Sequence, residues 1–232
     1  METSEQAKLW EKNLDRKAAK VRADRVLKQI KKYNPKTKKV LELGVGLGAV
    51  LVHFSQKYEV SGLDLQNEYT QIAKKLIPKS NFYVQGMDKF KINEKFDTIF
   101  SVHECINEVK PYKNWELTFK RVFEHLNQDG LWIFDMRTQK HLEEKKKQVV
   151  ELEKTPTGYL YDGFEVKGNK LFWKTVYFKK VKGNLYEIEH DNYFEEIYDI
   201  KKVEKSLLRH FKILDRIPTE GGLTFMFVCK KK

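Results

Sequence analysis

Apolar positions in the first part of the chain recur at three- and four-residue steps among charged residues. Between Gln6 and Tyr33 this apolar stripe contains Trp10, Leu14, Ala18, Val21, Val26, Ile30 and Tyr33. The spacing is that of an amphipathic helix and predicts one long helix or two short ones. Asn34-Pro35 ends the pattern, because a residue before proline avoids helical geometry.

Short apolar runs then alternate with helical patterns, which is the rhythm of βαβ units. The predicted strands lie at 38–43, 60–64, 81–85, 96–101 and 130–136. The predicted helices lie at 47–57, 68–77 and 114–126, and residues 141–154 are read as a charged helix or loop without a function. A helix near 199–210 and two strands at 211–217 and 223–228 close the chain.

Residues 158–197 break this rhythm, because aromatic and β-branched runs are separated by Gly168-Asn169 and Gly183-Asn184. Such dipeptides favour hairpin turns, so the segment predicts an antiparallel β meander inserted in an α/β domain. On its last strand, alternation places four acids on one face, expected to be solvated: Glu187, Glu189, Asp191 and Glu195. The other face, with His190 and Asn192, would pack on the domain or cover a ligand.

The chain therefore divides into four predicted parts. They are an N-terminal basic helical segment (1–37), an α/β core (38–157), the β insert (158–197) and the C-terminal part of the core (198–232).

Composition places the 232-residue chain among globular proteins, since 41% hydrophobic residues suffice for a core. No apolar run approaches the roughly 20 residues of a membrane span, and the first residues lack a signal-peptide layout. We therefore expect a cytoplasmic protein with no membrane contact. Cys105 and Cys229 stand in no disulfide or metal-binding pattern, so we expect no metal.

The formal charge of +12 is concentrated at the two ends of the chain. Residues 1–40 hold 13 Lys and Arg against 5 Asp and Glu, and three lysines end the sequence. A solvated helix face explains most such charge, but a basic patch could also attract RNA or an anionic substrate.

The strongest chemical signal is the stretch Glu42-Leu43-Gly44-Val45-Gly46-Leu47-Gly48-Ala49, where an apolar strand ends in three alternating glycines. Glycines let the backbone approach a ligand closely, and a following helix would direct its free N–H groups at a nucleotide-like cofactor. Two fingerprints fit: the dinucleotide form G-x-G-x-x-A, and E-x-G-x-G-x-G.

The second spelling resembles motif I of class I S-adenosyl-L-methionine (SAM)-dependent methyltransferases. Val60–Asp64, Phe96–Ser101 and Leu126–Asp135 are similar, in order and spacing, to that family's second, fourth and fifth strands. The resemblance covers residues 38–136. It implies an α/β, Rossmann-like, mostly parallel seven-stranded sheet with flanking helices, and SAM as cofactor. The β insert would then form a lid or a dimer surface, in a monomer or homodimer.

The resemblance also implies a set of cofactor-binding residues: Glu42, Gly44, Gly46, Gly48, Asp64, Leu65, Met87, Asp88 and Ser101. The glycines would admit the amino-acid end of SAM, and Glu42 would hold its ammonium. Asp64 would take the ribose hydroxyls. Asp88 would contact the adenine amine, although an Asp there is also an ordinary turn residue.

A polar cluster follows the fourth strand, at the sheet edge where ligands of α/β proteins gather. It resembles the D-S-x-N segment of small-molecule methyltransferases, with Glu104 at the acid, Cys105 in place of the serine, and Asn107 matching. It lacks the N-P-P-Y or D-P-P-Y signature of enzymes that methylate base amines. His103 is a candidate general base or an ordinary loop residue. A sulfonium methyl is already activated, so a base is not obligatory.

The predicted catalytic residues are His103, Glu104 and His190, and the predicted substrate-binding residues are Asn107, Asp135, Arg137 and Asn192. We expect methyl transfer to N or O of a small-molecule acceptor by in-line displacement. The alternatives are an RNA or protein methyltransferase that uses the basic N-terminal helix, a nicotinamide-dependent oxidoreductase, and a non-catalytic SAM-binding module.

Overall fold

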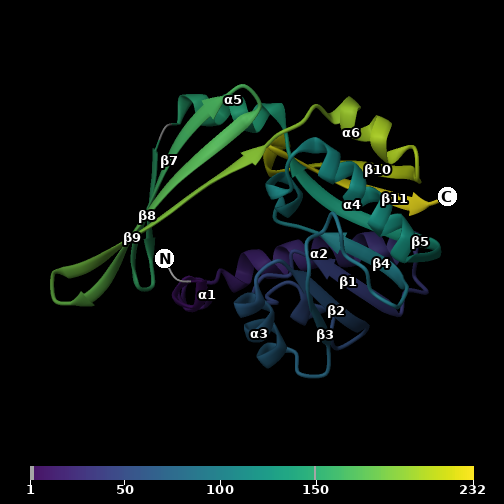
Figure 1. Ribbon diagram of the computed structural model, residues 1–232, viewed down its shortest axis with the longest axis horizontal. Helices are drawn as coiled ribbons and strands as arrows, with labels where there is room; N and C mark the ends of the chain where they lie inside the picture. Colours follow the sequence, from purple (N-terminus) through teal and green to yellow (C-terminus); the bar gives the residue numbers. More distant parts are fainter. Residues whose placement is uncertain (1–2, 149) are drawn as a thin grey trace.

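A computed structural model describes residues 3–148 and 150–232. Its larger sheet has seven strands in the order β10-β11-β5-β4-β1-β2-β3 (Figure 1). Their bounds are β1 (Lys39–Leu43), β2 (Glu59–Asp64), β3 (Asn81–Val84), β4 (Phe96–Ser101), β5 (Leu126–Arg137), β10 (Phe211–Thr219) and β11 (Thr224–Lys231). The first five strands pair in parallel, and β11 runs antiparallel to both β5 and β10. The predicted fold class is confirmed.

Helices cover both faces of this sheet: α2 (Arg16–Tyr33) lies on one face, and α4 (Tyr112–His125) and α6 (Ile200–Leu207) lie on the other. Helix α3 (Asn67–Leu76) packs beside β2 and β3, and α1 (Thr3–Lys12) contacts α3. Helix α5 (Gln139–Lys147) packs against the second sheet instead. One core lies between the sheet and α4 with α6, where Trp115 and Phe119 are fully buried. The other core lies between the sheet and α2.

The N-terminal pattern forms two helices, because Asp15 caps the second one. Its side chain accepts hydrogen bonds from the backbone N–H groups of Lys17 and Ala18. The buried stripe of α2 consists of Ala19, Ala23, Val26 and Ile30. Val21, which the apolar pattern had placed on the packed face, is 51% exposed.

The prediction of a helix at 47–57 was wrong. Residues 45–58 form a series of turns around the short 3₁₀ helix η1 (Leu51–His53). Gly44, Gly46 and Gly48 all have positive φ angles of 72°, 49° and 80°. Left-handed residues cannot continue a right-handed helix, so the chain leaves β1 through turns instead.

A second sheet of four antiparallel strands, which we call the lid sheet, projects from the α/β core (Figure 1). Its strands are β6 (Val150–Thr155), β7 (Gly158–Lys167), β8 (Lys170–Lys182) and β9 (Leu185–Glu196). Gly168-Asn169 and Gly183-Asn184 form the two predicted turns. Strand β6 pairs with β7 from residues that the sequence had assigned to the α/β core, so the lid sheet begins earlier than predicted.

Among the described helices, none combines the length and apolar composition that a membrane span requires. Within the same described ranges, no group of His, Cys, Asp and Glu side chains could hold a metal ion.

Candidate active-site cleft

A cleft of about 840 Å³ opens at the carboxyl ends of β1, β2 and β4. In α/β sheets ligands bind where the strand order reverses, which here is between β1 and β4. One part of the lining, the glycine-loop wall, comes from residues 42, 44–47, 49–50, 63–66, 69 and 85–89. The other part, the composite wall, comes from residues 10, 13–15, 18–19, 22, 102–103, 105, 108–110 and 114, with Glu153 of the lid sheet.

The three glycines of the loop have different structural tasks. A Cβ on Gly44 would come within 2.8 Å of Met87 Cε, and one on Gly48 within 3.0 Å of Ala73 Cβ, so both glycines allow close packing. A Cβ on Gly46 would meet no atom within 4 Å. Gly46 therefore keeps space free inside the cleft rather than inside the core.

Asp64, at the end of β2, lines the cleft and also holds the glycine loop. Its Oδ2 accepts a hydrogen bond from the Gly46 N–H at 2.8 Å, and its Oδ1 accepts one from the Gln66 N–H at 3.0 Å. Burial raises the pKa of Asp64, although these backbone donors oppose the shift. A carboxylate with lone pairs left over can accept further bonds from ligand hydroxyls.

Glu42 is a buried carboxyl group in the wall of the same cleft, only 2% exposed. Its Oε2 has no hydrogen-bond partner among the described residues. Burial and the nearby Asp64 carboxylate raise the pKa of Glu42 well above its usual value. An unpaired buried oxygen is costly unless a ligand donor satisfies it, so the site fits the ammonium end of SAM.

The remaining predicted cofactor residues divide into two groups. Leu65, Met87 and Asp88 line the cleft, and Leu65 presents an apolar side chain that is 70% exposed. Gly48 packs against Ala73, and the Ser101 hydroxyl is buried without a described partner. Most of the predicted set is thus gathered on the glycine-loop wall.

His103 also lines the cleft, on the composite wall. It and Glu104 have left-handed backbones, with φ of 65° and 54°. Asp135 clamps this turn, since its two carboxylate oxygens accept hydrogen bonds from the N–H groups of His103 at 3.2 Å and Glu104 at 2.7 Å. Burial and the Glu104 carboxylate raise the pKa of Asp135. Asp135 does not line the cleft, so its geometry is that of a positioning residue.

Enclosure by the cleft walls, together with the positive charges of Arg22 and Arg137, lowers the pKa of His103 to about 4. The imidazole is therefore neutral near pH 7 and able to accept a hydrogen bond or a proton.

Glu104, Asn107 and Arg137 do not line the cleft but form a buried network beneath it. Arg137 Nη2 lies 3.5 Å from Glu104 Oε2, and Arg137 Nε donates to Glu195 Oε2 of β9 at 2.6 Å. Asn107 accepts from the Arg137 N–H and donates to the Glu196 carbonyl, both at 2.9 Å. The network joins the end of β5 to the lid sheet. The structure thus turns these predicted site residues away from the ligand space.

The predicted orientation of β9 is reversed. His190 and Asn192 are exposed and line no part of the cleft, whereas Glu195 is buried. The reason is the Arg137 guanidinium, which draws the acidic face of β9 inward. The sequence could not show this, because the pairing joins residues 58 positions apart.

Several residues of the cleft escaped the sequence analysis. They include Trp10, Arg22, Tyr69, Glu108, Lys110 and Asn114. Glu108 ends the 3₁₀ helix η2 (Cys105–Glu108), in the polar cluster that the sequence had indicated. Its spacing of three residues from Cys105 could have indicated that Glu108 lies on the same face as Cys105, since residues i and i+3 of a 3₁₀ helix share a face.

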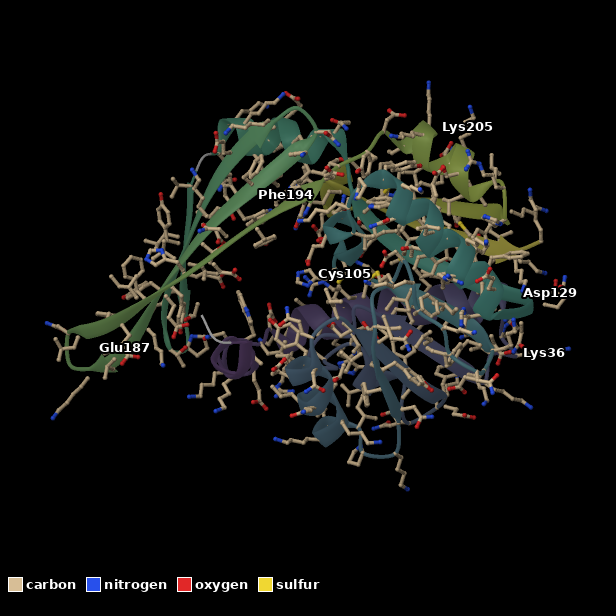
Figure 2. The ribbon with its side chains drawn as sticks, viewed as in Figure 1. Lys36, Cys105, Asp129, Glu187, Phe194 and Lys205 are labelled. Atoms are coloured by element: carbon tan, nitrogen blue, oxygen red, sulfur yellow. The ribbon has the colours of Figure 1, made fainter. Side chains whose placement is uncertain are left out.

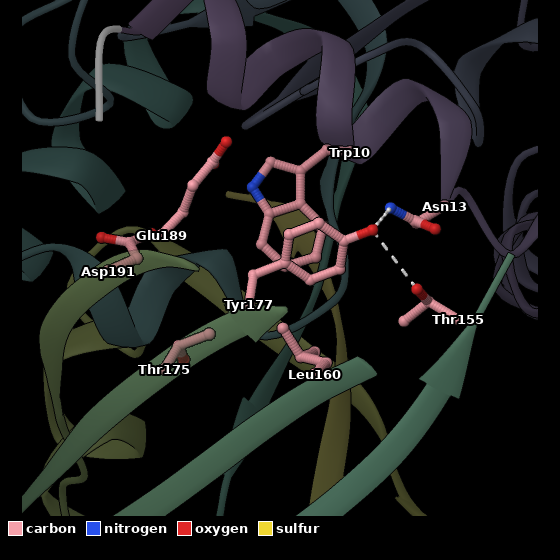
Figure 3. A pocket seen from close by; sticks show the side chains of 8 residues that line it. All are labelled: Trp10, Asn13, Thr155, Leu160, Thr175, Tyr177, Glu189 and Asp191. Carbon is pink, nitrogen blue, oxygen red and sulfur yellow. Dashed lines mark hydrogen bonds between the residues drawn. The ribbon is translucent and has the colours of Figure 1, made fainter. Parts of the chain in front are cut away.

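The end of α1 bridges the cleft and the lid sheet. Trp10 and Asn13 line both the cleft and a small adjoining pocket with Leu160, Thr175 and Glu189 (Figure 3). Asn13 Nδ2 donates to the Tyr177 hydroxyl at 3.3 Å. The N-terminal segment is thereby attached to the lid sheet, 164 residues further along the chain.

The fold and the cleft together define a class I SAM-dependent methyltransferase architecture, and the comparisons agree with this class. A family model described as mycolic acid cyclopropane synthetase matches residues 8–177, so the chain belongs to this family.

Two curated proteins are similar in sequence to about half of the chain. The Bacillus subtilis (strain 168) protein YqeM, named as an inferred methyltransferase, is 28% identical over 120 residues, 50% of this chain and 49% of its own. The dTDP-3-amino-3,4,6-trideoxy-alpha-D-glucopyranose N,N-dimethyltransferase of Streptomyces venezuelae is 22% identical over 107 residues, 46% of this chain and 45% of its own. The chain spans about half the length of these curated relatives.

A solved structure extends the agreement in fold to nearly the whole chain. The S-adenosylmethionine-dependent methyltransferase from Clostridium acetobutylicum ATCC 824 superposes with a TM-score of 0.83 and 18% identity, covering 98% of each chain. The sequence-based recognition of the SAM-dependent methyltransferase class is thus confirmed, and SAM rather than a nicotinamide is the cofactor that the comparisons support.

Proposed function

We propose that this protein is an enzyme that transfers a methyl group from SAM to N or O of a small polar acceptor. The observation that carries the proposal is the glycine-loop wall. There an open Gly46, an anchored Asp64 and a Glu42 oxygen with no partner in the described part of the chain face one cleft at the switch point of the sheet.

In this proposal the chain's own residues bind and orient the cofactor. Glu42 accepts hydrogen bonds from the cofactor ammonium, which supplies the partner that its Oε2 does not find among the described residues. Asp64 accepts from the ribose hydroxyls, Leu65 covers the adenine ring, and Asp88 accepts from the adenine amine. SAM supplies an activated methyl group, so the protein mainly has to hold donor and acceptor in line.

The composite wall supports a polar acceptor rather than an acyl chain. His103, Glu108, Lys110 and Asn114 present ionisable and amide groups to the cleft. The Streptomyces venezuelae relative is named for an amino sugar, and that name makes sugar nucleotides a reasonable first acceptor screen.

The alternative acceptor, RNA, rested on the basic N-terminal segment and stays a prediction. On α2 three of the cations already have acidic neighbours: Lys20 pairs with Asp24, Lys32 with Asp215 and Arg25 with Glu220. Such pairing favours a solvated surface. A cytoplasmic location and a monomeric or dimeric state also stay predictions.

Calorimetric titration with SAM, S-adenosylhomocysteine and NADH tests the proposed function. We expect micromolar binding of the first two ligands, no heat with NADH, and at least a tenfold loss of SAM affinity in Asp64→Ala. Hydrogen bonds to a charged group contribute about 1.5–3 kcal/mol, which corresponds to such a loss. Binding of NADH alone, or of no ligand, would contradict the proposal.

A further inference from the structure

Glu108 occupies a position in the cleft that the cofactor does not require. In the 3₁₀ helix η2 it follows Cys105 by three residues, so the two side chains lie on the same face. Cys105, labelled in Figure 2, packs against the glycine loop, with its Cβ and Sγ 3.0 Å from the position of a Cβ on Gly44. Glu108 itself lines the cleft that the glycine loop also lines.

The Glu108 carboxylate is not used by the fold. Among the described residues, none forms a hydrogen bond or an ion pair with it, although it lines the cleft. Lys110, the nearest cation in sequence, donates instead to the Phe194 carbonyl at 2.7 Å, and its ammonium lies 3.6 Å from the Phe194 ring centroid. If Glu108 had a structural role, we would expect its carboxylate oxygens to accept hydrogen bonds from the surrounding residues.

The part of the cleft around Glu108 has a negative electrostatic character. Asp64 on β2 and Glu195 on β9 act on Glu108 with negative charge, while Lys110 and Arg137 act with positive charge. Arg137 is already paired with Glu195. In the same cleft, burial and the charges of Asp64, Asp191, Glu108 and Glu68 raise the pKa of Tyr69, whose hydroxyl therefore stays protonated.

We propose that Glu108 is a catalytic residue that binds the ammonium group of an amine acceptor beside the transferred methyl group and removes its proton. The proposal rests on the proposed function and narrows the acceptor atom to an amine nitrogen. Tyr69 lines the same cleft and offers a neutral hydroxyl as a second hydrogen-bond partner.

The proton and electron balance is simple. The acceptor ammonium gives one proton to the Glu108 carboxylate and becomes a neutral amine. The amine nitrogen then bonds to the methyl carbon while the carbon–sulfur bond breaks, and that electron pair remains on sulfur. The products are a methylated ammonium and S-adenosylhomocysteine, and Glu108 returns its proton to water.

Acid strength favours Glu108 over His103 for this step. Enclosure by the cleft, with the charges of Glu195 and Asp64, raises the pKa of Glu108 to about 7, whereas the pKa of His103 is lowered to about 4. A general base is most effective when its pKa lies near the working pH. His103 is so weak a base that an ammonium would seldom transfer its proton to it.

Sinefungin gives a test that needs no knowledge of the acceptor. This SAM analogue carries a protonated amine where SAM carries the methyl sulfonium, so it places an ammonium at the point of transfer. The measurement is the ratio of sinefungin to S-adenosylhomocysteine affinity, by calorimetry, for the wild type, Glu108→Gln, Glu108→Asp and Glu68→Gln. Glu68 lies in the first turn of α3, next to Tyr69, and does not line the cleft, so it is a matched charge control.

At pH 8 we expect Glu108→Gln to lower this ratio about tenfold relative to the wild type, a change of about 1.4 kcal/mol. Its affinity for S-adenosylhomocysteine should change less than twofold. Glu68→Gln should keep the wild-type ratio. Between pH 8 and pH 6 the wild-type ratio should fall as Glu108 takes up a proton, and the ratio of Glu108→Gln should stay flat.

An unchanged ratio in Glu108→Gln overturns the proposal while leaving the proposed function intact. If Glu108→Gln does not bind S-adenosylhomocysteine, Glu108→Asp and the wild-type pH profile decide, and a flat profile overturns the proposal. If the wild type binds neither ligand, the proposed function itself fails.

Discussion

The two walls of the cleft are built in different ways. The glycine-loop wall comes from three short segments that each follow a parallel strand, and backbone hydrogen bonds hold it, such as those from Gly44 and Val45 to the Leu63 carbonyl. The composite wall joins residues from the N-terminus, the end of β4 and the lid sheet. Side chains hold it, chiefly Arg137 and Asn13.

This difference shows how one fold can keep a cofactor and change its acceptor. Backbone bonds at strand ends tolerate many side chains, so the glycine-loop wall depends on few residues. Side-chain bridges depend on the particular pair of residues. The composite wall can therefore change its lining without disturbing the other wall, and it should also be the wall that single substitutions damage most selectively.

Among the substitutions that test the difference between the two walls, Arg137→Ala should have the largest effect on stability. The substitution leaves Glu104 and Glu195 as buried carboxylates without their cation. Breaking a buried pair in this way costs about 3–5 kcal/mol. Urea denaturation should show this loss in the free energy of unfolding. Lys20→Ala, which breaks an exposed pair with Asp24, should cost less than about 1 kcal/mol. Equal losses in the two variants would mean that the network does not support the composite wall.

Acid should weaken the composite wall through His141 of α5. Burial and the charges of Arg137 and Lys145 lower the pKa of His141 to about 3, and its Nε2 lies 3.3 Å from Arg137 Nη1. The unfolded chain takes up this proton near pH 6.5, so stability present above pH 6.5 is lost as the pH falls toward 3.

The measurement is the free energy of unfolding of wild type and His141→Gln at pH 7 and pH 5. From the linkage relation, the wild type should lose about 2 kcal/mol more than the variant between these values. Gln keeps an acceptor for Arg137 and does not titrate. Parallel losses would show that His141 does not take part in acid sensitivity.

A glycine substitution can test the glycine-loop wall separately from backbone strain. Gly46 and Gly183 have similar φ angles of 49° and 56°, and a Cβ on either meets nothing within 4 Å. Alanine at each position should destabilise the protein by a similar amount, about 1–2 kcal/mol for a left-handed residue. Only Gly46→Ala should weaken SAM binding, about tenfold or more, because its methyl group enters the cleft. Calorimetric titration of both variants with SAM is the measurement. An equal affinity in the two variants would show that Gly46 does not contribute to the SAM site.

The smallest expected effect is that of Asn13→Ala, which removes the contact between the N-terminal segment and the lid sheet. Asn13 accepts from Thr157 Oγ1 at 3.0 Å and donates to the Tyr177 hydroxyl at 3.3 Å. Water can replace such hydrogen bonds between neutral side chains, so their loss should lower the free energy of unfolding by about 1 kcal/mol or less. Hydrogen–deuterium exchange should accelerate several-fold in α1, and Asn184→Ala in the β8–β9 turn should leave α1 unchanged. Unaltered exchange in both would show that the contact does not hold α1.

Sequence-based prediction was more accurate for the glycine-loop wall than for the composite wall. The parallel strands and the two Gly-Asn turns of the lid sheet were predicted, because each is a local pattern of spacing and residue type. Most of the proposed cofactor residues lie together in one cleft for the same reason. The helix at 47–57 was wrong, since the apolar pattern of Leu47, Val50 and Leu51 is that of buried turns as well as of a helix. Strand β6 was missed because only Val150 and Leu152 mark an apolar face between its charged residues, and both of them are exposed.

The chain's sequence by itself determined the class of protein and the glycine-loop wall. Strand ends, glycines and Asp64 lie within about 20 residues there, where backbone geometry follows from local sequence. Only the tertiary structure decided which side chains line the composite wall. It turned Glu104, Asn107 and Arg137 into a support, left His190 and Asn192 exposed, and placed Glu108 in the cleft. The physical reason is that the orientation of a polar or charged side chain depends on its partner, and the hydrogen-bond partners in this support lie 30 to 89 residues apart.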